Sequence, residues 1–113
     1  MPTQHQVLAE GRWFTLSLAE QMGNIGSEVN RTISWRQKGN AEFAENAFVR
    51  SIELLDLTLA DERWRGPKRK EVARVRESWC ESMEEKQSTG VFDLGLSRYL
   101  DHFAVMARSQ KGL

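Results

Sequence analysis

The residues with the clearest capacity to bind a ligand lie in one basic stretch between positions 63 and 76. This stretch contains seven lysine or arginine residues and one acid, Glu71. Trp64 stands between two of the arginines, which places an aromatic ring beside cationic side chains. Cations can follow a phosphate backbone, and an aromatic ring offers a stacking surface to bases. The stretch therefore predicts a nucleic-acid-binding surface made by Arg63, Arg65, Lys68, Arg69, Lys70 and Arg74.

The same lysine and arginine residues also have a purely structural interpretation. The preceding stretch, 41–62, carries six acids and a single base, Arg50, and antiparallel helices of opposite charge can pair side by side. Trp64 and its neighbours could then close one end of a helical structure. The start of a helix is nevertheless an unfavourable place for bases, because that end of the helix dipole is positive. Net charge does not decide the question, since sixteen basic residues balance sixteen acidic residues.

Two glycines, Gly23 and Gly26, form a Gly-x-x-Gly sequence that resembles the loop of KH nucleic-acid-binding domains. That family usually has a basic residue between the glycines, whereas this chain has Asn24 and Ile25. No flanking strands are predicted either. The alternative is a helix in which both glycines allow a neighbouring helix to approach closely, at a propensity cost of about 1 kcal/mol each. A variant of this alternative uses Gly23 and Gly26 in a self-association contact.

Arg98 and His102 are four positions apart, so a helix would project both side chains from one face. The pair resembles the Arg-to-His motif of HEPN-type ribonucleases, which are helical bundles. This resemblance implies a histidine that acts as acid or base and an arginine that holds phosphate. The family places more residues between the two than the three found here, and we assign no catalytic residue. The alternative is a solvated Arg98 beside Asp101, with His102 as a surface residue.

Metal and redox chemistry have few candidate ligands in this sequence. Cys80 is the only cysteine, which excludes an intrachain disulfide, and the two histidines, His5 and His102, are far apart. The spacings typical of zinc sites and of di-iron carboxylate bundles do not occur. We therefore predict no metal site and no cofactor, and we interpret Cys80 as a small buried residue. The cysteine usage and the short apolar runs favour a cytoplasmic location away from membranes.

Hydrophobic periodicity predicts four helices joined by short connections. Ser17 and Glu20 form a capping box at the start of the first helix, Gly39 ends it, and Asn40 caps the second. A loop is predicted at Gln87–Gly90. The predicted helices are Ser17–Lys38, Asn40–Leu59, Lys68–Lys86 and Asp93–Ser109.

Connections this short place consecutive helices side by side, so the predicted fold is all-α, an up-down antiparallel four-helix bundle. A chain of 113 residues has the size of one domain, and we expect a single helical-bundle domain over 1–113 with loosely ordered residues 1–11. The predicted core consists of Phe48, Leu55, Val75, Trp79, Leu100 and Phe103.

Three strings of the sequence resemble an uncharacterised family of small prokaryotic helical-bundle proteins. These strings are Ser17–Val29, Trp35–Asn40 and Ser51–Leu59, within a likeness that spans about Leu18–Arg108. The resemblance implies a bundle and brings no activity and no catalytic residues. A looser likeness is to the HEPN-like bundles that partner minimal nucleotidyltransferases in toxin–antitoxin pairs. Trp35–Leu59 also looks like one tetratricopeptide helix pair, but an array needs about three such units.

Four tryptophans exceed what one small core needs, and tryptophan is enriched among interface anchors. The primary prediction is therefore a non-enzymatic protein-interaction module or homo-oligomer that binds another protein or a second copy. Trp35, Trp64, Gly23 and Gly26 are the predicted interface residues. The alternatives are an RNA- or DNA-binding accessory protein that uses the basic segment 63–76, and an HEPN-like ribonuclease or its degenerate relative.

Overall fold

The computed structural model describes residues 11–89 and 94–111, and this part of the chain is helical. Its α-helices are α2 (Leu18–Gln37), α3 (Ala41–Leu59), α4 (Pro67–Thr89) and α5 (Leu94–Lys111). Two short 3-10 helices, η1 (Arg12–Thr15) and η2 (Glu62–Trp64), precede α2 and α4. No strand occurs among these residues, which confirms the all-α prediction. Except at Gly11, the loose order predicted for residues 1–11 lies outside the described residues.

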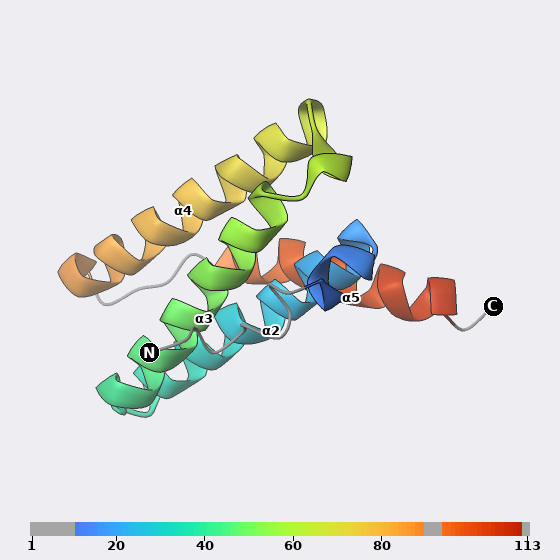
Figure 1. Cartoon of the computed structure of the whole chain (residues 1–113). Coiled ribbons are helices and arrows are strands. Elements are labelled where there is room, and N and C mark those ends of the chain that lie inside the picture. Colours follow the sequence, from blue (N-terminus) through green and yellow to red (C-terminus); the bar gives the residue numbers. More distant parts are fainter. Residues whose placement is uncertain (1–10, 90–93, 112–113) are drawn as a thin grey trace.

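The helices form an up-down antiparallel bundle in which α3 lies between α4 and α2, and α5 returns to pack on α2 (Figure 1). α2 packs extensively against both α3 and α5, whereas α4 packs mainly on α3 and meets α5 at few positions. Between α4 and α5, Tyr99 Oη donates to Glu71 Oε1 at 3.0 Å beside a cavity of about 220 Å³. One side of α4 is consequently left without a neighbouring helix in the described part of the chain.

The predicted helix ends near the α2–α3 turn are confirmed. Ser17 Oγ accepts from the Glu20 amide at 3.1 Å, and Glu20 Oε1 accepts from the Ser17 amide at 3.0 Å. Gly39, with φ +79°, turns the chain after α2. Asn40 Oδ1 then accepts from the Phe43 amide at 3.0 Å and starts α3. These are local interactions of side chains with the nearby backbone, which explains why sequence alone locates them.

The end of α4 corrects one prediction. The helix continues through Thr89, so residues Gln87–Thr89 are helical and do not belong to the predicted loop. Gln, Ser and Thr all tolerate a helix, and the first strong helix-breaking residue after them is Gly90. α5 follows its prediction closely, since it begins at Leu94 and ends at Lys111.

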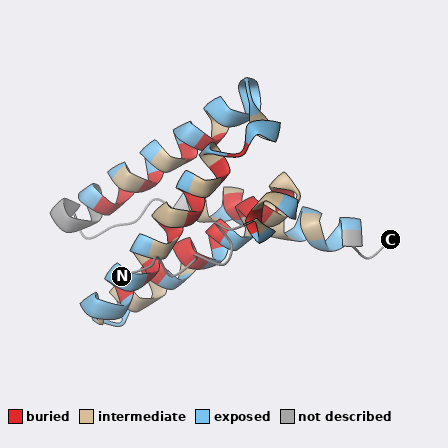
Figure 2. Ribbon diagram, in the orientation of Figure 1, coloured by how far each residue is buried: buried red, intermediate tan, exposed pale blue. Residues whose placement is uncertain are grey.

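The core is built mainly from the facing sides of α2, α3 and α4, with Leu100 from α5, and Figure 2 shows buried residues along the inner sides of the helices. Among the six predicted core residues, Leu55, Val75, Trp79 and Leu100 are buried. The other two, Phe48 and Phe103, are half-buried at the edge of this core. Trp13 of η1, which periodicity did not assign, is also a buried core residue.

Gly23 and Gly26 set the distance between α2 and α5. A Cβ atom at Gly26 would lie 3.0 Å from Leu100 Cβ, and one at Gly23 would lie 3.1 Å from Ala104 Cα. Both distances are shorter than ordinary van der Waals contact, so the missing side chains allow the helices to pack this closely. The close helix packing predicted from the sequence is therefore confirmed, and it occurs within one chain.

The position of the glycine pair within α2 also bears on its two other interpretations. The Gly-x-x-Gly sequence lies inside α2, so it does not form a KH-type loop. Gly26 is buried against α5 and is covered by the chain's own last helix, whereas Gly23 is half-buried; the self-association contact predicted for the pair stays a prediction.

Leu55→Ala removes a fully buried side chain and should lower the free energy of unfolding by about 2–5 kcal/mol, because a cavity remains. Urea titration followed by circular dichroism measures the loss. Val49→Ala on the exposed side of the same helix is the control, and we expect it to change stability by about 0.5 kcal/mol or less. Equal losses in both variants would contradict the assignment of the inner face.

Gly23→Ala should destabilise the protein although alanine is the better helix former. The gain of about 1 kcal/mol in helix propensity is outweighed by overpacking of about 1–3 kcal/mol against the Ala104 backbone, which cannot move aside as a flexible side chain would. Ser27→Ala, on the exposed side of the same helix, is the matched control. A Gly23→Ala variant that is more stable than wild type in urea titrations would contradict this prediction, because it would show that α5 can shift away from α2 at little cost.

Candidate functional site

Gln21 of α2 has a fully buried side chain that joins three other parts of the chain. Its Nε2 donates to the Trp13 carbonyl at 2.9 Å and to Asp61 Oδ2 at 3.1 Å. Its Oε1 accepts from Trp64 Nε1 at 2.8 Å. The indole of Trp13 donates to Thr58 Oγ1 at 3.1 Å. We call these five residues the Gln21 network, and it fixes η1, α2, the end of α3 and η2 against one another.

Asp61 is the buried charge of this network, with 3% of its surface exposed. The Arg63 guanidinium donates to Asp61 Oδ2 at 2.7 Å and, from the same nitrogen, to the Leu16 carbonyl at 2.7 Å. Hydrogen bonds from Arg63 are the main reason that the pKa of Asp61 lies below its ordinary value, while burial opposes them. The same partnership raises the pKa of Arg63. This pair therefore holds η2 onto the start of α2.

Trp64, a predicted interface residue, is half-buried and committed to this network. Cations lie over its ring, with Arg63 Cζ at 4.3 Å and Lys68 Nζ at 5.2 Å from the centroid. The indole is thus hydrogen-bonded inside the molecule while its ring contacts cations of the same chain. It is not a free anchor for a partner or a free stacking surface for a base.

Other bases of the segment 63–76 also have partners within the chain. Arg69 Nε donates to the Leu59 carbonyl at 2.8 Å and so covers the C-terminal, negative end of α3. This contact explains a base at the start of α4, because the end of α3 lies beside it. Ion pairs occupy three further arginines: Arg65 with Glu62, Arg74 with Glu71 and Arg76 with Asp56. The pairing of α3 with α4 that the sequence suggested is observed at Arg76.

A second group of aromatic side chains lies at the opposite end of α3. The rings of Trp35 and Phe43 meet edge to face with centroids 4.8 Å apart, and Lys38 Nζ lies 5.0 Å from the Trp35 centroid. Phe43 is 46% exposed. A cavity of about 230 Å³ beside the two rings is completed by Asn46 and Arg50. We call this the Trp35–Phe43 surface.

The buried carboxylate of Glu28 holds Arg50, one of the residues that line the cavity of the Trp35–Phe43 surface. Glu28 Oε2 accepts from Arg50 Nε at 3.1 Å, and Glu28 Oε1 accepts from Arg31 Nη1 at 2.6 Å. Glu28 itself is buried, so two guanidinium groups share one carboxylate between α2 and α3. The hydrogen bond that Arg50 Nε donates to Glu28 thereby positions Arg50 at the cavity wall.

Sequence analysis identified Trp35 but missed Phe43. Phe43 does not follow the apolar periodicity of the helix predicted at Asn40–Leu59, so the sequence analysis treated it as a surface residue. The available signal was a phenylalanine in the first helical turn, three positions after the Asn40 cap and off the inward side of the helix.

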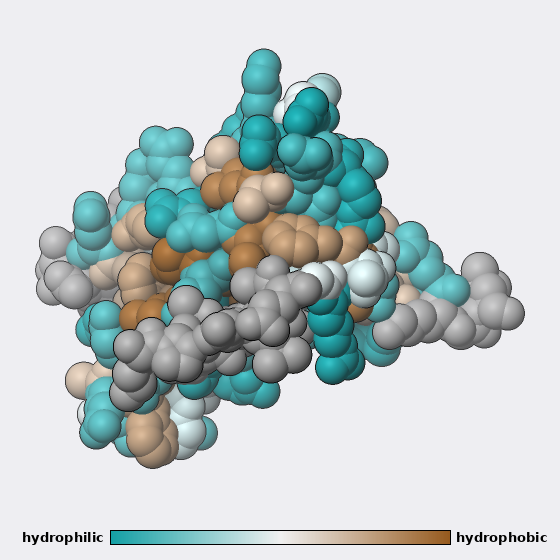
Figure 3. Space-filling view, viewed as in Figure 1, coloured by the Kyte–Doolittle hydropathy of each residue, from teal (hydrophilic) through white to brown (hydrophobic). Residues whose placement is uncertain are grey.

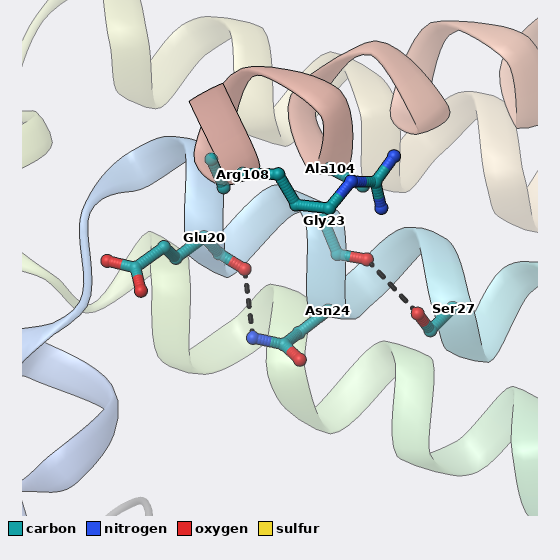
Figure 4. Close-up of a pocket in the computed structure, with 7 residues that line it drawn as sticks. Glu20, Gly23, Asn24, Ser27, Ala104 and Arg108 are labelled. Atoms are coloured by element: carbon teal, nitrogen blue, oxygen red, sulfur yellow. Dashed lines mark hydrogen bonds between the residues drawn. The ribbon is translucent and has the colours of Figure 1, made fainter. Parts of the chain in front are cut away.

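The surface between α2 and α5 is a shallow groove with small residues along its floor (Figure 4). Its volume is about 230 Å³, and Glu20 and Arg108 are its charged residues. Asn24 Nδ2 donates to the Glu20 carbonyl at 2.9 Å, and Ser27 Oγ donates to the Gly23 carbonyl at 3.4 Å. The polar side chains of the floor thus bond to their own helix, as Figure 4 shows.

Arg98 and His102, the pair that resembles the HEPN motif, are both exposed on α5. Their neighbour Asp101 accepts from Asn30 Nδ2 at 3.0 Å, and this bond ties α5 to α2. Cys80 is half-buried, less enclosed than its predicted role as a small buried residue required. Within residues 11–89 and 94–111, no group of three or more His, Cys, Asp or Glu side chains could hold a metal ion.

Comparison with protein-family models, with curated proteins and with solved structures finds no match to this chain. The resemblance to an uncharacterised family of prokaryotic bundles therefore stays a prediction. No helix in the described part of the chain has the length and apolarity that a bilayer-spanning segment requires.

Asp61→Asn should remove the acid-dependent part of the stability that the Asp61–Arg63 pair provides. The folded-state pKa of Asp61 is lowered, so its contribution is complete above the unfolded-state value of about 4 and is lost as the pH falls through the folded-state pKa. We expect the variant to be about 2 kcal/mol less stable at pH 7, because charge-assisted hydrogen bonds are lost.

Urea titrations at pH 7 and at about pH 3 measure this effect, and the gap between the two proteins should narrow at the lower pH. Asp56→Asn is the matched control, because Asp56 pairs with Arg76 at 2.9 Å but is exposed. The control should cost about 1 kcal/mol or less. A gap that stays constant from pH 7 to pH 3 would rule out Asp61 ionisation as its cause.

Proposed function

We propose that this chain is a non-enzymatic, cytoplasmic protein-interaction module that uses the Trp35–Phe43 surface as its anchor. The observation that supports the proposal is the 46% exposure of Phe43 in an edge-to-face pair with Trp35. Aromatic and arginine side chains supply a large share of the binding energy in protein interfaces. The Trp35–Phe43 surface combines both types around a cavity that can receive a partner's side chain.

Preorganisation strengthens this proposal. The Trp35 ring is held by Phe43 and contacts Lys38, and Arg50 is held by the buried Glu28. Side chains that are already fixed lose less conformational entropy when a partner binds. The remaining predicted interface residues offer less, because Trp64 is committed to the Gln21 network and Gly26 is covered by α5.

The second candidate is an RNA- or DNA-binding accessory function of the segment 63–76. The observation in its favour is a charge excess at the α3–α4 connection, where residues 61–76 include seven bases and three acids. Lys68 and Lys70 are exposed there. The arginines of the segment would have to exchange their present partners for phosphates. The HEPN-like ribonuclease alternative depends on the exposed Arg98–His102 pair alone.

Phe43→Ala should weaken capture of a protein partner by at least about tenfold while the fold stays intact, because an anchor contact is worth 2 kcal/mol or more. Met106→Ala is the matched control, since Met106 is exposed to a similar degree, 48%, on the different helix α5. Affinity capture from lysate with nuclease, quantified by mass spectrometry, compares wild type with both variants.

Partners lost with Phe43→Ala and retained with Met106→Ala would support the proposed surface. Equal recovery with both variants would overturn it. Partners that disappear on nuclease treatment in all three proteins, with binding that falls steeply as salt rises, would favour the nucleic-acid alternative.

A further inference from the structure

The exposed side of α4 carries its charges in two blocks of opposite sign. The first half of the helix has an exposed basic block, and the second half has an exposed acidic block. The basic block is Lys68, Arg69, Lys70 and Arg74, and the acidic block is Glu77, Glu81 and Glu84. Figure 3 shows mainly hydrophilic side chains on the outer edge of the molecule along α4.

This order of charges is unfavourable for a helix that stands alone. Bases near the N-terminus and acids near the C-terminus both oppose the helix dipole. Like charges also repeat four positions apart, as in Lys70 with Arg74 and Glu77 with Glu81, and such pairs repel each other along one face. This order of charges therefore destabilises α4 when the helix is considered alone.

Contacts within the chain relieve this pattern only in part. Arg69 covers the end of α3, and Arg74 pairs with Glu71 at 3.2 Å in an exposed ion pair of small worth. Among the described residues, no ion pair involves Lys70, Glu77 or Glu81. α3 and, to a small extent, α5 cover the other sides of α4, so this outer side remains uncovered.

A second copy of α4 that runs antiparallel to the first presents acidic residues opposite its basic residues and basic residues opposite its acidic residues. In one register, Lys70 and Arg74 of one copy lie opposite Glu81 and Glu77 of the other. Because a two-fold axis relates the copies, each of these pairs occurs twice. Ala73 on this side adds no bulk that would keep the helices apart. The two helix dipoles also oppose each other in this arrangement.

We propose that the outer side of α4, formed by Lys70, Arg74, Glu77 and Glu81, binds the same side of a second copy in an antiparallel two-fold pair. The interaction is electrostatic and weakens as salt rises. It deepens the proposed interaction function by naming one partner. It uses a different surface from Trp35–Phe43, so the failure of one leaves the other standing.

Sedimentation equilibrium of the purified full chain, treated with nuclease, tests this pairing at about 50 mM and about 500 mM NaCl, where screening differs strongly. We expect self-association at low salt and at least a tenfold weaker association at high salt. The variant K70E/R74E makes this side uniformly acidic, and E77K/E81K makes it uniformly basic. Each variant alone should be monomeric, whereas their equimolar mixture should form a heterodimer.

The variant that carries all four substitutions exchanges the two blocks and should self-associate again. F43A, on the separate surface, should associate as wild type does. Far-UV circular dichroism confirms the fold of each variant, and both charge reversals bring α4 closer to the order that the helix dipole favours. If one double variant failed to fold, the fourfold variant would still decide the case.

Three results would overturn the proposal. The first is a wild-type chain that remains monomeric at low salt and high protein concentration. The second is association that persists equally in both double variants. Wild-type association that requires nucleic acid, and vanishes with nuclease, would equally overturn it and would assign the basic block to a polyanion.

Discussion

Burial of the Gln21 side chain is the constraint on which much of this structure depends. A buried amide without hydrogen-bond partners is costly, and Gln21 obtains its partners from two other segments: Trp13 of η1, and Asp61 and Trp64 at η2. The start of α2 is therefore stable only when η1 and η2 are both in place. Arg63 completes this arrangement because it neutralises Asp61 and reaches the Leu16 carbonyl. Arg63, which the sequence assigned to a nucleic-acid-binding surface, thus holds the α3–α4 connection against the start of α2, and Arg69 covers the end of α3.

The remaining architecture follows from the way α2 is surrounded. Two glycines bring α5 against one side of α2, and α3 covers another side. α4 then has α3 as its main neighbour and keeps a long exposed side. The molecule consequently exposes the two unlike surfaces that we propose for recognition. The Trp35–Phe43 surface is aromatic and preorganised, whereas the outer side of α4 is polar and carries charge of both signs. Their separation would allow one chain to contact two partners simultaneously.

Sequence predicted those features that depend on neighbouring residues. The capping box at Ser17, the turn at Gly39 and the cap at Asn40 each involve atoms within a few residues of one another, and all three were located correctly. The burial of Trp13 was missed because its partner, Thr58, is 45 residues away. Trp64 was assigned to an interface for the same reason, since its indole reaches Gln21 across 43 residues. Phe43 was missed because hydrophobic periodicity identifies the side chains that face the core. It does not distinguish among the side chains that face solvent.

The contact between α5 and α2 has a consequence for the entropy of the chain. Asn30 and Asp101 meet across 71 residues, whereas Glu71 and Tyr99 meet across 28. The cost of closing a flexible loop grows only with the logarithm of its length, so the longer closure costs about 0.8 kcal/mol more than the shorter one. The close packing of α5 on α2 at Gly23 and Gly26 compensates for this difference in closure entropy. The last helix can therefore return to α2. α4 is left with one side in contact with solvent, although Val72, Val75, Trp79 and Met83 on its other side belong to the core.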